Sequence, residues 1–303
     1  MRGEPSDDDT AARARRGARA TAGELAGAAA AARAGRAAQA IATRGRAPAA
    51  AAAAAIATWG RVPAVAAAAA AIATWGCVPA ASAPLRTVAY GHAGGAAADT
   101  LLVLLPGRGD RAETFAAEGF VDAARAADPR VDVVAADAHI GYYLRNVIVD
   151  RLWEDVVVPA RARGYARVWL AGISMGGLGA VAFARAHPDA VAGLCLLAPY
   201  LGDDVVAEVR RAGGLARWRP SGAPDDFARL WLFLKGYTAG APGLPALWLG
   251  YGRSDRFAAA HDLLAAALPA DHVLRADGGH DWPPWRALWA QFLARRPLHP
   301  DGA

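Results

Sequence analysis

The sequence predicts an α/β protein with a mostly parallel central sheet. From about residue 85 onward, short apolar runs alternate with segments whose apolar residues recur every three or four positions. Strands buried on both faces of a parallel sheet give such runs, and amphipathic helices give such spacings. At 303 residues and 55% hydrophobic content, the chain can also bury one large core. The regular alternation of the two patterns therefore indicates βαβ units.

Each predicted element follows from its own stretch of sequence. Apolar runs predict strands at residues 87–90, 101–105, 131–135, 168–171, 194–197, 247–249 and 273–274. Helical spacings predict helices at residues 112–127, 146–163, 177–186 and 257–268, and Pro159 should kink the second of them. In such doubly wound sheets, ligands bind beyond the carboxyl ends of the strands. The residues directly after the apolar runs are therefore the candidates for chemistry.

A turn of sequence Gly-Ile-Ser-Met-Gly, residues 172–176, lies between an apolar run and a helical pattern. A sharp turn from strand to helix strains the backbone of its serine, and it needs glycines nearby because a Cβ would collide there. Such a turn exposes the serine hydroxyl at the start of the helix. The sequence therefore predicts Ser174 as a nucleophile.

Two later loops supply an acid and a histidine. Asp255 follows the sixth apolar run, and His280 follows the last one in the sequence Gly-Gly-His. Each group reaches the same sheet edge on its own loop, in the chain order serine, aspartate, histidine. We expect His280 to take the proton from Ser174 and Asp255 to orient the imidazole. Asp203 or Asp204, which follow the fifth run, are the alternative acid.

The loop after the run at 101–105 reads Pro-Gly-Arg-Gly-Asp, residues 106–110. Acyl transfer develops negative charge on the carbonyl oxygen, and N–H donors fixed around that oxygen lower the barrier. We expect the backbone N–H groups of Arg108 and Met175 to form this oxyanion hole, while the Arg108 side chain packs or pairs. Gly107 is a candidate for substrate contact.

At these residues the sequence resembles the α/β-hydrolase superfamily, from roughly residue 85 to the C-terminus. Its Leu-Pro-Gly-x-Gly and Gly-x-Ser-Met-Gly-Gly turns, residues 105–109 and 172–177, look like those of bacterial carboxylesterases and acyl thioesterases. The resemblance implies the α/β-hydrolase fold and hydrolysis of a small-molecule ester or thioester through an acyl-enzyme, without a metal or cofactor. The loop at Pro106 departs from the more usual His-Gly opening.

Two other classes of function remain open at this point. An acyltransferase or a peptidase would use the same three side chains, and adding an alcohol or amine acceptor would distinguish transfer from hydrolysis. A non-catalytic binding protein would keep the sheet, but it would have no reason to retain Ser174, Asp255 and His280 in register.

Further candidates for substrate contact lie outside these loops. The connection before the sixth strand is longer than usual, and it predicts a small helical lid at about residues 201–243. Its aromatic side chains, Trp231 among them, either pack the lid onto the body or line an acyl pocket. The loop after the third strand should edge the crevice, which makes His139, Tyr142 and Tyr143 candidates for the same role.

Residues 1–84 differ in composition from the hydrolase-like region at 85–303. They are rich in Ala, Arg and Gly, repeat a short Ile-Ala-Thr unit, and hold few large apolar residues, so they predict a low-complexity tail without its own core. Ten arginines against five acidic residues in 1–64 account for the whole net charge of +5. The remainder is neutral, so it offers no basic face for nucleic acid.

The two cysteines predict neither a disulfide framework nor a metal site. Cys195 lies in an apolar run and is expected to be an inert core thiol. Cys77 follows an apolar run that resembles a lipoprotein signal, so membrane contact is expected only if this segment is an anchor. A cytoplasmic location is favoured, and export or lipid anchoring is the alternative.

Overall fold

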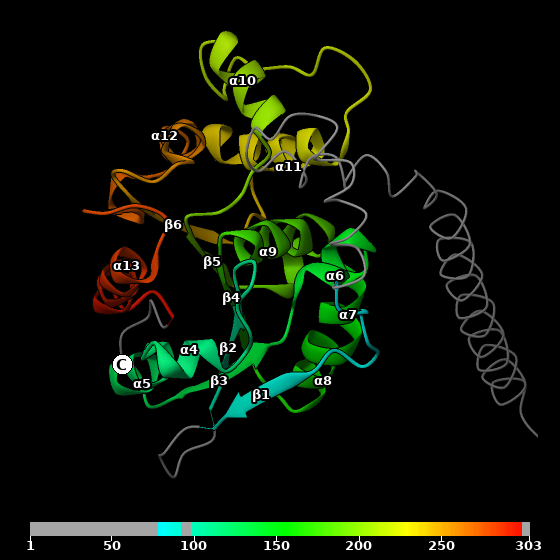
Figure 1. Cartoon of the computed structure of the whole chain (residues 1–303), viewed down its shortest axis with the longest axis vertical. Helices are drawn as coiled ribbons and strands as arrows, with labels where there is room; N and C mark the ends of the chain where they lie inside the picture. The colour runs from blue at the N-terminus through cyan, green and yellow to red at the C-terminus, as the bar shows by residue number, and fades with distance from the viewer. Residues whose placement is uncertain (1–77, 92–97, 299–303) are drawn as a thin grey trace, which may run out of the picture. The chain divides into compact units, whose positions relative to one another are not determined.

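The computed structural model describes residues 78–91 and 98–298, which build one seven-stranded sheet (Figure 1). Its strands are β1 Thr87–Tyr90, β2 Thr100–Leu105, β3 Val131–Ala136, β4 Arg167–Ile173, β5 Gly193–Leu197, β6 Ala246–Gly252 and β7 Val273–Ala276. They lie in the order β1-β3-β2-β4-β5-β6-β7. Neighbouring strands are parallel except β1, which pairs antiparallel with β3. The predicted parallel sheet therefore carries one antiparallel strand at its edge.

Helices connect the parallel strands, as expected for βαβ units. They are α4 Thr114–Ala117, α5 Phe120–Ala127, α6 Ile140–Leu144, α7 Ile148–Leu152, α8 Val158–Ala162, α9 Met175–Ala186, α10 Asp203–Arg211, α11 Asp226–Lys235, α12 Ala258–Ala265 and α13 Trp282–Ala294. Short 3-10 turns precede β5, β6 and β7.

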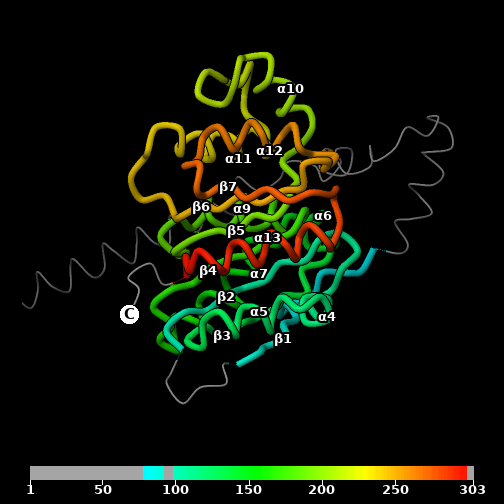
Figure 2. The backbone as a smooth tube through the Cα atoms, turned by 90° about the vertical axis from the view of Figure 1, so that its left-hand side faces the viewer, coloured from blue at the N-terminus to red at the C-terminus, as the bar shows by residue number. Residues whose placement is uncertain are grey.

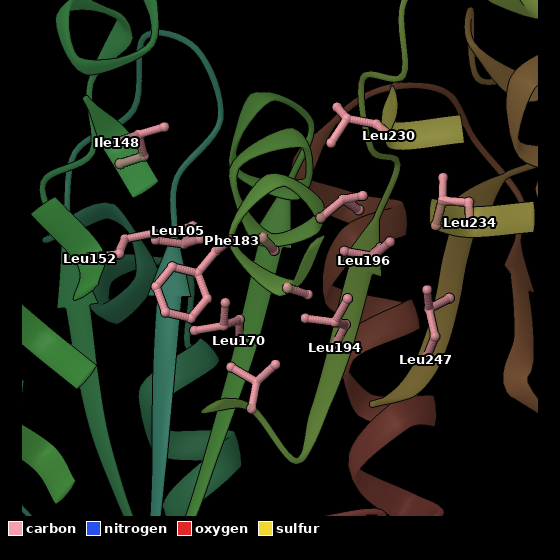
Figure 3. Close-up of a cluster of buried hydrophobic side chains, with 14 of the residues drawn as sticks. Leu105, Ile148, Leu152, Leu170, Phe183, Leu194, Leu196, Leu230, Leu234 and Leu247 are labelled. Atoms are coloured by element: carbon pink, nitrogen blue, oxygen red, sulfur yellow. The ribbon is translucent and has the colours of Figure 1, made fainter. Parts of the chain in front are cut away.

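Each face of the sheet is covered by an apolar layer. Helices α4, α5 and α13 cover one face, and α5 and α13 lie toward the viewer in Figure 2. Helices α7, α8, α9 and α12 cover the other face, with α10 and α11 packed outside α12 and α9. Figure 3 shows part of this second layer, where Phe183 of α9 lies beside Leu170 of β4 and leucines of β5 and β6 continue the layer along the sheet. Burial on both faces explains why the central strands read as unbroken apolar runs.

The strand order, the antiparallel strand at one edge and the helices on both faces are those of the α/β-hydrolase fold. All six residues of β2 and all five of β5 are buried, and parallel pairing aligns the carboxyl ends of β2, β4, β5 and β6. The loops that follow these strands therefore meet at one edge of the sheet.

Two predicted helices are interrupted. Gly119, with a φ of 77°, separates α4 from α5 within the predicted helix at 112–127. The predicted helix at 146–163 contains a π-helical segment, Trp153–Val157, and Pro159 then enters the first turn of α8. Proline has no N–H to donate to the carbonyl four residues before it. The π-helical segment changes the hydrogen-bond register of the helix, so Pro159 lies at a position where no backbone N–H donor is needed.

Two helices were not predicted from the sequence. The loop expected after β3 contains α6, which His139 caps by accepting a hydrogen bond from the Gly141 N–H at 3.2 Å. The larger one is α13, which begins with Asp281 as its cap and carries Pro283 and Pro284 in its first turn. Prolines are tolerated there because the first N–H groups of a helix have no intrahelical acceptor.

The segment predicted as a lid, residues 201–243, holds α10 and α11, which lie together at the top of Figure 1. Its tryptophans face inward: Trp231 is fully buried and donates its indole N–H to the Leu201 carbonyl at 2.8 Å, and Trp218 is buried as well. In the described part of the segment, these aromatic side chains pack it onto the body.

The described chain begins a few residues before the domain boundary predicted at 84. Ser82 shares a 2.9 Å hydrogen bond with the Tyr142 hydroxyl, and the Leu85 N–H donates to the Asp155 carboxylate at 2.7 Å. The repeats, Cys77 and the segment considered as an anchor lie outside the described residues, so their role stays a prediction. Within the described residues, none of the helices has the length and apolarity needed to cross a bilayer.

Cys195 lies fully buried in β5, as predicted for a core thiol. Burial raises the pKa of its thiol well above the ordinary value, which keeps it in the unreactive protonated form.

Candidate active site

Ser174 occupies the sharp turn between β4 and α9. Its backbone has a φ of 53° and a ψ of −112°, a conformation that residues with a side chain rarely adopt. The loop after β5 holds it in place: the Ser174 N–H donates to the Leu197 carbonyl at 2.9 Å, and its carbonyl accepts from the Tyr200 N–H at 3.0 Å. The turn therefore fixes the serine at the N-terminus of a twelve-residue helix.

The glycines of this turn are required by close backbone packing. A Cβ on Gly172 would collide with the Gly176 carbonyl, and a Cβ on Gly176 would collide with the Leu105 carbonyl at the end of β2. Only glycine permits these approaches. The start of α9 consequently lies directly against the loop that follows β2.

His280 links Ser174 to Asp255 through two hydrogen bonds. Its Nε2 lies 2.9 Å from the Ser174 Oγ, and its Nδ1 lies 2.8 Å from the Asp255 Oδ2. A carboxylate can only accept, so Nδ1 carries the proton and donates to Asp255. In the neutral imidazole, Nε2 is then the acceptor for the serine hydroxyl. Loops after β4, β6 and β7 thus assemble a relay in which His280 can take the serine proton.

Asp255 is held in its ionised form although it is buried. Its side chain has no exposed surface, and that of His280 is 7% exposed. Burial raises the pKa of the Asp255 carboxyl, but hydrogen bonds from His280 and from the Phe257 N–H at 2.8 Å outweigh burial and leave the pKa below its ordinary value. The alternative acids, Asp203 and Asp204, are exposed at the start of α10.

A cavity of about 320 Å³ opens over Ser174 and His280. The other residues that line it are Gly107, Arg108, Gly109, Asp110, Arg256 and Trp285. This volume lies at the lower end of the range for small-molecule sites. The loop after β2 therefore borders the serine, as the sequence predicts for an oxyanion loop.

The structure does not gather all predicted substrate contacts at this cavity. Gly107 lines it, whereas Tyr142, Tyr143, His139 and Trp231 are not among its lining residues. Tyr142 is buried beside Ser82, and a Cβ on Gly179 would meet the Tyr143 hydroxyl at 2.6 Å. A role for these four side chains in binding substrate stays a prediction.

Four lining residues were not singled out for this role from the sequence: Gly109, Asp110, Arg256 and Trp285. Arg256 directly follows Asp255, and Asp110 closes the loop after β2, so both follow apolar runs and the strand-end rule could have found them. Trp285 comes from the unpredicted helix α13, and its ring packs edge-on against the His280 ring at a centroid distance of 5.1 Å.

The described residues hold no group of three or more His, Cys, Asp or Glu side chains placed as metal ligands would be. The hydrogen-bonded serine, histidine and aspartate can move a proton, and the serine hydroxyl can form a covalent bond to carbon.

Several solved structures resemble this chain at low sequence identity. An S-formylglutathione hydrolase from Agrobacterium tumefaciens is 15% identical, with 73% of this chain and 93% of that chain covered and a TM-score of 0.49. An S-formylglutathione hydrolase from Staphylococcus aureus is 17% identical, with 67% and 82% covered and a TM-score of 0.46. A fluorophosphonate-binding serine hydrolase from Staphylococcus aureus is 15% identical, with 71% and 99% covered and a TM-score of 0.48.

No family model matches the sequence, and no curated protein matches it. The α/β-hydrolase fold of this chain follows from its own strand order and from the turn at Ser174.

Proposed function

We propose that this chain is a serine hydrolase that cleaves a small carboxylic ester or thioester through an acyl-enzyme. The observation that carries the proposal is the unbroken hydrogen-bonded path from the Ser174 Oγ through His280 to Asp255, which opens into a cavity. A serine hydroxyl is a weak nucleophile by itself, and a neighbouring base that removes its proton activates it.

In the first half-reaction, the Ser174 Oγ attacks the carbonyl carbon while the His280 Nε2 takes its proton. The carbonyl π-bond becomes an oxyanion, and collapse of this intermediate expels the alcohol or thiol, which receives the proton from His280. In the second half-reaction, His280 takes a proton from water, water attacks the acyl-enzyme, and the carboxylic acid leaves as Ser174 regains its proton. Asp255 holds the imidazole and stabilises its cationic form throughout.

The oxyanion is assigned to the backbone N–H groups of Arg108 and Met175. Met175 begins α9, where the first N–H groups of a helix have no intrahelical acceptor and favour negative charge. Arg108 lines the cavity on the loop after β2, in a turn that the Asp110 N–H closes onto the Gly107 carbonyl at 3.3 Å. Donors that are fixed before the reaction need no reorganisation when charge develops.

Hydrolysis of short- and medium-chain para-nitrophenyl esters tests the proposal. We expect Ser174→Ala to lower kcat/KM by at least about a thousand-fold, because the nucleophile is removed. Ser221→Ala is the matched control, since Ser221 is exposed in the loop before α11. Activity that survives in Ser174→Ala would contradict the assignment. Recovery of free acid in the presence of an added alcohol distinguishes hydrolysis from acyl transfer.

A further inference from the structure

Two arginines and one aspartate are among the residues that line the cavity over Ser174. Arg108 and Arg256 line it, and the carboxyl among its lining residues is that of Asp110. The chain from residue 65 to 303 is neutral as a whole, so two arginines among the residues that line one small cavity are a local feature. A surface of one sign around a cavity raises the local concentration of substrates of the opposite sign.

Arg256 is held beside the relay by aromatic stacking. Its guanidinium lies over the Phe257 ring at 5.0 Å from the centroid, and that ring packs edge-on against the His280 ring at 5.1 Å. Stacking occupies the face of a guanidinium, while its N–H donors lie around its edge in the same plane. The side chain can therefore stay in place and direct its donors toward an anion in the cavity.

Arg108 lies on the other side of the nucleophile. It follows β2 and Arg256 follows β6, and these two strands lie on opposite sides of β4, which carries Ser174. The two arginines therefore reach the cavity from loops on either side of Ser174.

Asp110 opposes this charge only in part. The pKa of its carboxyl is raised, mainly by burial and further by the negative charge of Glu118. A hydrogen bond with the Trp282 side chain lowers this pKa, but by less than the other two effects raise it. Its Oδ2 is directed at the position of Gly107, where an added Cβ would meet it at 3.2 Å. The carboxyl thus faces the wall of the cavity formed by the loop after β2.

We propose that the cavity binds an ester bearing a second, anionic oxyacid group, a carboxylate or a phosphate, through the guanidinium groups of Arg256 and Arg108. Planar guanidinium groups match both anions with two parallel N–H···O bonds. The volume of about 320 Å³ places the anion only a few bonds from the scissile carbonyl. This inference rests on the proposed hydrolase function, because it names the substrate class of the same site.

Matched ester pairs test the proposal. One pair has the anion on the acyl side: para-nitrophenyl glutarate against its methyl ester. Two pairs have it on the alcohol side: the acetyl esters of para-hydroxybenzoate and of para-hydroxyphenyl phosphate, each against its neutral methyl ester. We expect kcat/KM to favour the anion by about ten-fold or more in at least one pair. The favoured pair shows which anion is bound and on which side.

Variants assign the preference to the arginine. We expect Arg256→Gln to reduce the anionic-to-neutral ratio of kcat/KM by about ten-fold, mainly through KM, and Arg256→Glu to invert it. Arg253→Gln should leave the ratio unchanged, since Arg253 lies on the same loop but pairs with Asp277 outside the cavity lining. Equal kcat/KM for the members of all three pairs would overturn the proposal and leave ester hydrolysis intact.

A binding measurement separates failure of this proposal from failure of the hydrolase function. In calorimetry on Ser174→Ala, amide analogues of all three pairs are compared: the anilide of glutarate and the acetamides of para-aminobenzoate and of para-aminophenyl phosphate, each against its methyl ester. At least one acid should bind about ten-fold more tightly than its methyl ester, and Arg256→Gln added to this variant should remove the difference. Equal affinity for acid and methyl ester in all three pairs overturns the anion site, whether or not the wild type cleaves esters. Selective binding without ester cleavage supports the anion site and contradicts the hydrolase function.

Discussion

Ser174 combines a reactive position with a backbone conformation that disfavours any side chain. Its positive φ is maintained by bonds to the loop after β5 and by the close packing at Gly172 and Gly176. Such conformations cost on the order of 1–3 kcal/mol and persist only where surrounding structure imposes them. The strain is therefore a property of the Cβ, and it can be measured separately from the chemistry of the hydroxyl.

Replacing Ser174 by glycine should relieve this strain. Ser174→Gly and Ser174→Ala both remove the hydroxyl and its bond to His280, but only alanine keeps the Cβ. We expect Ser174→Gly to have the larger free energy of unfolding by about 1 kcal/mol, after allowing for the greater entropy of glycine in the unfolded chain. Urea denaturation of the two variants measures the difference. Equal stability would show that the turn holds no strain at this Cβ.

Asp255 should matter for catalysis more than for substrate binding. Asp255→Asn keeps the shape of the side chain but cannot stabilise an imidazolium, and it favours the wrong tautomer of His280, so we expect kcat to fall by about a thousand-fold or more. The control is Asp277→Asn, since Asp277 lies on the loop before His280 with a fully exposed side chain. Steady-state kinetics on one ester measures both. A fall in kcat of less than ten-fold in Asp255→Asn would contradict the assignment of Asp255 as the acid of the relay.

At the residue scale, the sequence predicted the three residues of the relay better than the residues that line the cavity. Ser174, Asp255 and His280 each follow an apolar run, and the structure brings them within hydrogen-bond distance. The lining by Trp285 could not be predicted from strand ends, because this side chain comes from helix α13, which begins at Trp282, two positions after His280. The candidate contacts His139 and Trp231 followed from position along the chain, which does not specify where a side chain points.

At the scale of elements, α12 supports the turn at Ser174 through the loop that follows β5. His261 of α12 is fully buried, and its Nε2–H donates to the Pro199 carbonyl at 3.0 Å. The next residue, Tyr200, donates its N–H to the Ser174 carbonyl. The Nδ1 of His261 is buried without a partner within the described residues, and burial lowers the pKa of the imidazole. His261 is therefore a neutral positioning residue.

His261 should make stability depend on pH. Its folded pKa lies below the unfolded value of about 6.5, so its contribution is full above about pH 6.5 and is lost as the pH falls toward the folded pKa, by at most about 1.4 kcal/mol per pH unit. His261→Gln can keep a donor to Pro199 but cannot titrate. We expect urea denaturation between about pH 7.5 and 5.5 to show a smaller loss of stability in this variant than in the wild type.

Burial also lowers the pKa of the half-buried His139 and His187. Both residues are present in the wild type and in His261→Gln, so their contributions to the pH dependence cancel in the comparison. An identical pH dependence in wild type and His261→Gln would contradict the assigned neutral, buried state.

The strands were the elements that the sequence predicted best, because burial on both faces leaves an unbroken apolar run. The helices were predicted less completely. The π-helical segment before Pro159 depends on the hydrogen-bond register of the backbone, which apolar spacing does not report. The spacing of Trp285, Leu288, Trp289 and Phe292 would have revealed α13, but the two prolines in its first turn are typical of a loop.

At the scale of the whole molecule, the relay and its cavity draw on residues 107–285. Deletion of residues 1–77 should therefore leave kcat/KM for a small ester within about two-fold of the wild-type value. Deletion of residues 1–86 is the contrast, since it also removes the buried Leu85 and its bond to Asp155. We expect this longer deletion to lower the free energy of unfolding by about 2 kcal/mol or more, measured by urea denaturation.

A loss of activity on removing residues 1–77 would contradict the predicted division of the chain into a tail and a hydrolase domain. It would also give the tail a part in catalysis that its composition does not suggest.

The last helix has a consequence for how the protein is made. The Trp289 indole N–H of α13 bonds to the Phe120 carbonyl, across 169 positions of the chain, and α13 covers the same face of the sheet as α5. A ribosome emits residues in order, so strands β2 to β6 emerge while this face still lacks the cover of α13. Until α13 has emerged, the nascent chain presents apolar surface to chaperones and to other chains. Ser174 is synthesised early, but the relay cannot form until His280, 106 positions later, has emerged.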